Sequence, residues 1–143
     1  MSDWADLLDD PRTIRAIFGD APSLDQVELH SVVLDGPAVK LHIELAESEF
    51  PVEPPKKHRW PIQHWHEAGF NRAYFFLLCS AVRSLEIRGL ETDPTFDLSI
   101  EREDGLLRVS GGTEQMSVDI RSEFLMVTSD SVKAYQRRDP PVL

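Results

Sequence analysis

Residues Trp60–Leu90, with the sequence WPIQHWHEAGFNRAYFFLLCSAVRSLEIRGL, decide the fold class of this chain. A segment rich in Pro and Trp leads into two apolar runs, Ala73–Cys79 and Leu85–Ile87, and no helical pattern separates them. Ala73–Cys79 is apolar at nearly every position, which is typical of a central strand that is buried on both faces. The stretch therefore predicts neighbouring strands of a sheet.

The flanking sequence continues this pattern. Apolar and polar residues alternate from Val39 to Leu45, as in a half-buried strand, and later runs bring the number of expected strands to about eight. Asp10-Pro11 and Gly19 mark the two ends of a short helix near the N-terminus. We predict an α+β fold, mainly β: an antiparallel β-meander, curled or split into two layers, with the short N-terminal helix on one edge. Hairpin turn signals support it at Asp35-Gly36, Asp104-Gly105 and Gly111-Gly112.

The length of 143 residues predicts a single domain covering 1–143. Residues 48–71 break the strand pattern, and prolines make regular ladder pairing unlikely through most of this segment. A loop of this length within a compact domain usually has a function or covers part of the core. We therefore expect 48–71 to be a long loop rich in Pro and Trp.

Composition limits the classes of partner. The formal net charge is −10, which argues against a nucleic-acid surface, because such surfaces depend on Lys and Arg. The single cysteine, Cys79, has no partner for an intramolecular disulfide, which favours a reducing compartment. The chain opens without a signal-peptide pattern, and no apolar run is long enough to cross a bilayer. We expect a cytoplasmic protein without a membrane partner.

Three histidines, His58, His64 and His66, lie close together in the sequence. Two imidazoles on one face of a strand can chelate Zn²⁺, and His64-Trp65-His66 has the required alternation. However, Pro61 comes just before this pair, and no cysteine or carboxylate stands at a recognisable ligand spacing. We predict no metal here. For the two histidines on expected strands, His30 and His42, we expect solvent-facing or hydrogen-bonded rings.

No nucleophile stands out. The apolar neighbours of Cys79 predict a buried thiol with a raised pKa, which makes it inert. No serine lies in a G-x-S-x-G pattern. Gly111-Gly112 lacks the following helix and the G-K-[ST] ending of a phosphate loop. We predict that the protein is not an enzyme and takes no cofactor.

Acidic and aromatic residues are the candidates for partner contacts. A sheet face that carries acids is either simply solvated or an acidic docking surface, and the sequence leaves both readings open. Tryptophans in a Pro-rich loop either anchor a partner or fold the loop over an open end of the core. The candidate contact residues are Asp97, Glu101, Glu103, Asp119, Trp60 and Trp65.

The order of these features resembles the Imm50 group of immunity proteins from bacterial polymorphic toxin systems. The resemblance covers most of residues 14–128, and none of its motifs is a catalytic signature. They comprise a G-x-x-P-x-L motif, the loop tryptophans, an asparagine before a strand and a strand that ends in glycine. They stand here as Gly19-Asp20-Ala21-Pro22-Ser23-Leu24, Val27-Glu28-Leu29, Gly69-Phe70-Asn71 and Ser84-Leu85-Glu86-Ile87-Arg88-Gly89.

The resemblance implies a small cytoplasmic bacterial protein that binds and neutralises a cognate toxin domain, without catalytic residues of its own. A basic toxin would suit the acidic balance of the chain. We expect a monomer or a weak homodimer. Two alternatives stay open: a small-ligand-binding β-module with the 48–71 loop as a lid, and a structural subunit of a larger assembly with exposed sheet edges.

Overall fold

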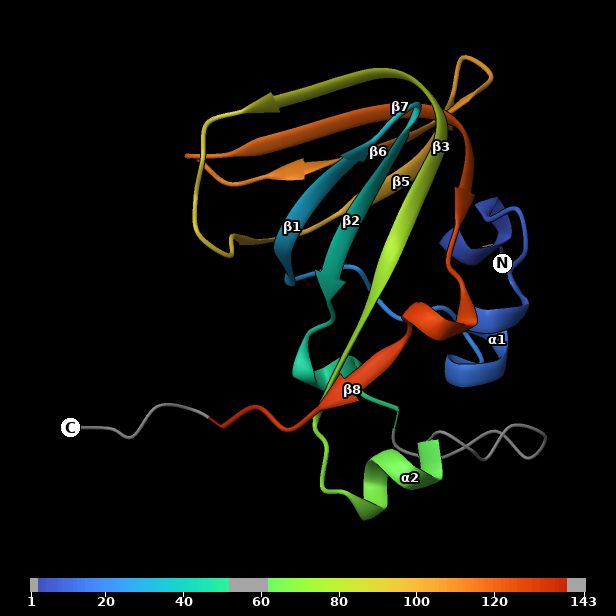
Figure 1. The fold of residues 1–143 in the computed structure, drawn as a ribbon, viewed down its shortest axis with the longest axis vertical. Helices are drawn as coiled ribbons and strands as arrows, with labels where there is room; N and C mark the ends of the chain where they lie inside the picture. The colour runs from blue at the N-terminus through green and yellow to red at the C-terminus, as the bar shows by residue number, and fades with distance from the viewer. Residues whose placement is uncertain (1–2, 52–61, 139–143) are drawn as a thin grey trace.

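The computed structural model describes residues 3–51 and 62–138, and these form a strongly curved antiparallel sheet with short helices (Figure 1). The mainly β fold predicted from the sequence is confirmed. None of the described helices is long and apolar enough to cross a membrane. The elements are η1 (Trp4–Leu7), α1 (Arg12–Phe18), β1 (Val27–Asp35), β2 (Ala38–Glu44), η2 (Glu47–Glu49), α2 (Ile62–Glu67), β3 (Arg72–Arg88), β4 (Thr95–Phe96), β5 (Ser99–Glu103), β6 (Leu106–Gly112), β7 (Ser117–Met126), η3 (Ser129–Ser131) and β8 (Lys133–Tyr135).

The strand order of the sheet is β4-β1-β2-β3-β7-β6-β5, and β8 also pairs with β3. The order departs from a simple meander at two points, because β4 returns to pair with β1 and β7 inserts next to β3. The first half of β3 pairs with β2, whereas the second half continues past the end of β2 and pairs with β7. The long strand β3 therefore belongs to both parts of the curved sheet.

The strand β3 contains a bulge near its middle. Ala81 has a φ of 53°, and the pairing with β7 shifts register between Val82 and Ser84. An extra residue in one strand bends that strand and increases its twist. The two strands expected at Ala73–Cys79 and Leu85–Ile87 are therefore one bent strand, which corrects the sequence-based division.

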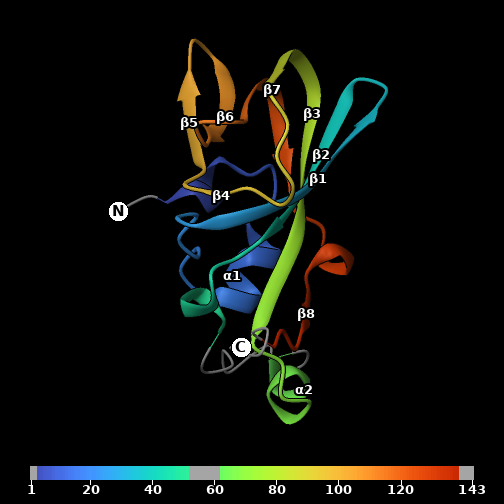
Figure 2. The same ribbon diagram turned by 90° about the vertical axis from the view of Figure 1, so that its left-hand side faces the viewer.

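A single hydrophobic cluster fills the inner side of the curve. The inner face of β1–β3 presents Leu29, Leu41, Ile43, Phe75 and Leu77, all buried. The N-terminal segment closes one side of this core with residues of η1 and α1, including Ala5, Ile14 and Ile17. In Figure 2, α1 lies on one side of β3, and β8 lies on the other.

Gly19 ends α1 as expected, whereas the helix begins one residue later than expected, at Arg12, with Pro11 and not Asp10 at the N-cap. The backbone N–H of Arg12 donates to the Asp10 carboxylate at 3.0 Å, and Gly19 ends α1 with a φ of 73°. The described part of the 48–71 segment contains α2, which the sequence reading took as loop. The backbone of His64 and His66 belongs to this helix and not to a strand, and helical positions two apart do not face each other. His58 lies outside the described residues.

Candidate functional site

Polar side chains gather on the outer face of β1–β3, opposite the hydrophobic core. Alternation along the strands turns Leu29, Ile43 and Phe75 inward, so their neighbours Glu28, Glu44 and Tyr74 stand on the outer face. These three residues occupy one row across the sheet, because Glu44 pairs with Glu28 on one side and with Tyr74 on the other. We call the group of polar residues around Glu44 the outer-face network.

Glu44 is the centre of the outer-face network and is only 1% exposed. Its carboxylate contacts Arg72 Nη2 at 2.6 Å, Arg137 Nη1 at 2.9 Å and His30 Nε2 at 3.1 Å, and it accepts a hydrogen bond from the Tyr135 hydroxyl. A buried charge is costly unless it is paired and hydrogen-bonded. These partners satisfy that requirement, and they come from four different segments of the chain.

The segment after β8 is fastened to this network by Asn71 and Arg137. The Asn71 side chain donates to the Arg137 carbonyl at 3.0 Å, and its carbonyl oxygen accepts from the Arg137 backbone N–H at 2.7 Å. The Arg137 guanidinium then reaches both Glu28 and Glu44. The asparagine before β3 therefore fixes the position of an arginine that is distant in sequence.

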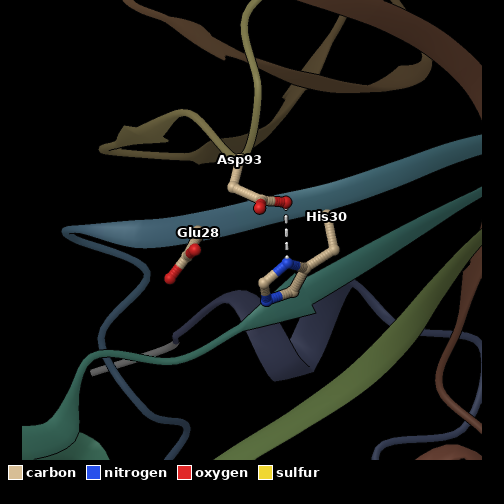
Figure 3. A group of neighbouring side chains, drawn as sticks. All are labelled: Glu28, His30 and Asp93. Atoms are coloured by element: carbon tan, nitrogen blue, oxygen red, sulfur yellow. Dashed lines mark hydrogen bonds and ion pairs between the residues drawn. The ribbon is translucent and has the colours of Figure 1, made fainter. Parts of the chain in front are cut away.

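His30 lies between two carboxylates. Its Nδ1 is 3.0 Å from Asp93 in the β3–β4 connection (Figure 3). Its Nε2 is 3.1 Å from Glu44. The His42 ring lies 5.1 Å from the His30 ring, between centroids, and it also packs against Tyr74 and Phe76. The expectation of a hydrogen-bonded histidine is confirmed for His30. Among the described residues, His42 Nε2 and Arg72 Nε are buried without a hydrogen-bond partner.

Burial and the neighbouring groups both shift the pKa values of the outer-face network, and for Glu44 and His30 the two effects oppose each other. Burial raises the pKa of Glu44, but the hydrogen bonds from Tyr135 and His30 and the charge of Arg72 outweigh it, so the pKa is lowered. Burial lowers the pKa of His30, but Asp93 and Glu44 outweigh it, so the pKa is raised. Burial, followed by the bond to Glu44, raises the pKa of Tyr135 to about 12. The network thus favours a carboxylate at position 44 and a protonated tyrosine.

The predicted acidic contacts lie elsewhere. Arg108 donates to Asp119 at 2.9 Å and to Glu103 at 3.1 Å, and Glu101 is exposed on β5 opposite Arg108 on β6. The structure therefore brings Glu101, Glu103 and Asp119 together around one arginine. Asp97 is separate from them, because its carboxylate accepts from the backbone and side-chain nitrogens of Gln26 at 2.9 and 3.1 Å.

The two tryptophan candidates have different outcomes. Trp65 is 4% exposed, belongs to the hydrophobic core and packs against Phe50 with ring centroids 6.0 Å apart. Part of the 48–71 segment therefore covers the core, as one of the two readings of the sequence expected. Trp60 lies outside the described residues. Cys79 is fully buried, and burial raises the pKa of its thiol to about 12, as expected for an inert cysteine.

Sequence reasoning missed the outer-face network. Alternation indicated that Glu28, His30 and Glu44 point away from the core, but an outward charged residue is normally solvated. Nothing in the local pattern shows that Arg72, Tyr135 and Arg137 cover Glu44. The one available signal was the cluster of polar residues on otherwise strongly apolar strands.

The family model described as Immunity protein 50 matches residues 10–133, which is most of the chain. The chain belongs to the Imm50 family. Searches of the curated proteins and of the solved structures found no match. The Imm50 resemblance noted in the sequence is thereby confirmed.

The residues that carry the Imm50 resemblance have structural roles in this chain. In the G-x-x-P-x-L stretch, Gly19 ends α1, the Pro22 carbonyl accepts from Trp4 Nε1 at 2.7 Å, and Leu24 is buried. Asn71 holds Arg137, as described above. Gly89 ends β3 where a Cβ atom would lie 1.9 Å from the Gln115 carbonyl oxygen. The motifs of this Imm50 protein thus specify turns and contacts of the fold.

Proposed function

We propose that this protein is a non-enzymatic immunity protein that binds a cognate toxin domain and neutralises it. The observation that carries the proposal is the Imm50 match over residues 10–133. A protein of this kind acts by occupying a surface of its target, so it needs stable shape and charge more than reactive groups. The buried thiol of Cys79, with a pKa raised to about 12, agrees with this reading.

Charge supports association with a basic toxin surface. The chain carries a formal net charge of −10, and long-range attraction between opposite charges accelerates encounter. Among the acids proposed as contacts, Glu101 is the most available, because it is exposed and lies opposite an arginine that two other acids already bind. We propose Glu101 and Asp97 as primary electrostatic contacts, and Glu103 and Asp119 as contacts whose charge Arg108 partly compensates.

An aromatic anchor would complete such a contact surface. Trp60 remains our proposed anchor. We no longer propose Trp65 for this role, because its indole packs within the core and leaves little surface for a partner. The mechanism that we propose is occlusion, in which the acidic surface covers the active site of the toxin.

Co-expression tests this function. Where the gene beside this one encodes a large secreted protein with a C-terminal toxin domain, that domain is the probe, produced in a bacterial host with or without the immunity protein. We expect growth arrest by the toxin domain alone, restored growth on co-expression, and a complex of the two purified proteins in size-exclusion chromatography. Arrest that co-expression does not relieve, together with no complex, would refute the proposed function.

A matched pair of charge reversals tests the electrostatic contact. Glu101→Lys is expected to slow association with the toxin domain several-fold, because it reverses a charge on the proposed surface. Glu47→Lys reverses an exposed acid in η2 and serves as the control. Equal association rates for both variants, measured by surface plasmon resonance, would contradict the electrostatic contact but leave the function standing.

A further inference from the structure

We propose that Glu28, His30 and Asp93 form a binding site for a divalent metal ion of the zinc type. One ligand atom from each of these residues lies within 4.8 Å of the other two. Figure 3 shows the three side chains as neighbours, with a hydrogen bond between Asp93 and His30. This site is separate from the acids proposed as toxin contacts, and the inference does not depend on the proposed function.

The fold positions the three groups without help from an ion. Glu28 stands on the outer face of β1, and the strand bulges between Leu29 and Ser31, where the His30 ring reaches Glu44 on the same face. Asp93 approaches from the β3–β4 connection, next to the short strand that pairs with the start of β1. Two ligands therefore come from a strand and one from the connection that the adjoining strand pair holds in place.

Each nitrogen of His30 faces a carboxylate oxygen, so a neutral ring cannot satisfy both contacts. Nδ1 lies 3.0 Å from an Asp93 oxygen, and Nε2 lies 3.1 Å from a Glu44 oxygen. Carboxylates only accept hydrogen bonds, and a neutral imidazole has a single N–H. One of the two contacts would then bring a nitrogen lone pair against an oxygen lone pair. A second proton or a metal ion at Nδ1 removes this repulsion.

Glu44 prepares His30 for metal binding. When the Nε2–H of His30 donates to Glu44, the lone pair of Nδ1 faces Asp93. Histidine ligands in metal sites almost always donate their other N–H to a carboxylate, a carbonyl or a water, which fixes the tautomer and raises ligand basicity. Here that carboxylate is buried and is itself held by Arg72 and Arg137, so the ring orientation is well determined.

The chemistry of the ligands selects the class of ion. One imidazole and two carboxylates suit Zn²⁺ and related transition metals, whereas Ca²⁺ and Mg²⁺ prefer oxygen ligands alone. Three protein ligands leave the fourth tetrahedral position for water or another donor. Arg137 opposes the ion, because its guanidinium binds Glu28 Oε2 and adds positive charge. The metal and Arg137 therefore compete for Glu28.

Because the metal and Arg137 compete for Glu28, some substitutions should lower the affinity for Zn²⁺ and another should raise it. Tag-free, metal-stripped full-length protein is titrated with Zn²⁺ by calorimetry, and Co²⁺ absorption reports tetrahedral coordination. We expect saturable binding of one ion per chain. Asp93→Asn and His30→Gln should lower the affinity at least as much as the roughly 10–100-fold typical for loss of an outer-shell partner. Arg137→Gln should raise it, because the variant frees Glu28.

Three outcomes would overturn the site: no saturable uptake at micromolar Zn²⁺, uptake unchanged in Asp93→Asn, or no rise in affinity in a folded Arg137→Gln variant. His66→Gln is the matched control, because His66 is exposed on α2 and bonds the Pro51 carbonyl instead. Loss of binding in His66→Gln but not in His30→Gln would place the ion on α2 and likewise contradict the inference. Far-UV circular dichroism and urea unfolding confirm that each variant is folded.

Discussion

Asp3 is the residue that joins the N-terminal elements to one another. Its carboxylate accepts from Nη1 and Nη2 of Arg15, both at 2.7 Å, and from the backbone N–H groups of Ala5 and Ala21 at 3.1 and 3.0 Å. The hydrogen bonds from Arg15, acting against a smaller effect of burial, lower the pKa of Asp3 to about 2. One short side chain thus connects η1, α1 and the segment before β1.

This pKa predicts how stability depends on pH. The folded-state pKa of Asp3 lies below its ordinary value of 3.8, so its contribution to stability is present above about pH 4 and is lost as the pH falls toward 2. We expect Asp3→Asn to lower the free energy of unfolding at pH 6 and the difference from the wild type to shrink toward pH 2. Urea unfolding across this range measures it, and a difference that does not change with pH would contradict the assignment.

At the residue scale, the sequence predicted which side chains are buried better than it predicted which side chains bind each other. The apolar neighbours of Cys79 indicated its burial, and alternation indicated which way Glu44 points. The partners of Glu44 were beyond reach, because Tyr135 and Arg137 are 91 and 93 positions away along the chain. Only folding brings such residues together, and no local pattern encodes the contact.

At the element scale, glycines at strand ends control how closely the connections approach the sheet. Gly89 ends β3 with a φ of 72°, and an added Cβ atom would lie 1.9 Å from the Gln115 carbonyl oxygen. Gly36, in the turn between β1 and β2, has a φ of 58° but no atom within 4 Å of such a Cβ. Both glycines therefore have a positive φ, but only Gly89 lacks room for a Cβ atom.

We predict unequal costs for the two alanine substitutions. Gly36→Ala should lower the free energy of unfolding by about 1–2 kcal/mol, the usual cost of a left-handed alanine. Gly89→Ala should cost clearly more, because the backbone around Gln115 must also move. Chemical denaturation of both variants measures the difference. Equal losses would show that the close approach at Gly89 carries no energetic weight.

The sequence predicted most strands correctly as strands, but it did not predict how far each one extends. The apolar runs predicted strands correctly, yet the polar and small residues around Ala81 looked like an interruption, whereas the strand continues through a bulge. Helix α2 was missed because the prolines before it dominated the reading of 48–71. In both cases tertiary contacts decided the result, with β7 beside the end of β3 and the core beneath Trp65.

At the scale of the whole molecule, the outer-face network ties distant parts of the chain to the centre of the sheet. Glu44 on β2 binds a residue of β1, a residue of β3, a residue of β8 and an arginine beyond β8. Its substitution should therefore affect the whole fold, and not one element.

Removing the charge of Glu44 tests this role. Glu44→Gln leaves the half-buried Arg72 without its carboxylate, and loss of one partner of a buried pair typically costs about 3–5 kcal/mol. We expect a loss of this size in the free energy of unfolding, measured with urea. Glu47→Gln, in an exposed position, should stay within about 0.5 kcal/mol of the wild type. A loss below 1 kcal/mol for Glu44→Gln would mean that the network is replaceable.

The pairing of β3 with β7 also limits how far this protein can fold while it is being synthesised on the ribosome. When residues 72–88 have been synthesised, β1 and β2 can already pair with the first half of β3, but the second half lacks its partner until residues 117–126 emerge. The N-terminal segment also cannot complete its contacts before β7 is synthesised, because the Asp9 N–H donates to the Leu125 carbonyl at 2.8 Å. A nascent chain of this length exposes an unpaired strand edge, which is a site of aggregation. This edge is covered only when β7 pairs with it, late in synthesis. We therefore expect stalled chains that end before β7 to be sensitive to proteases and full-length chains to be resistant.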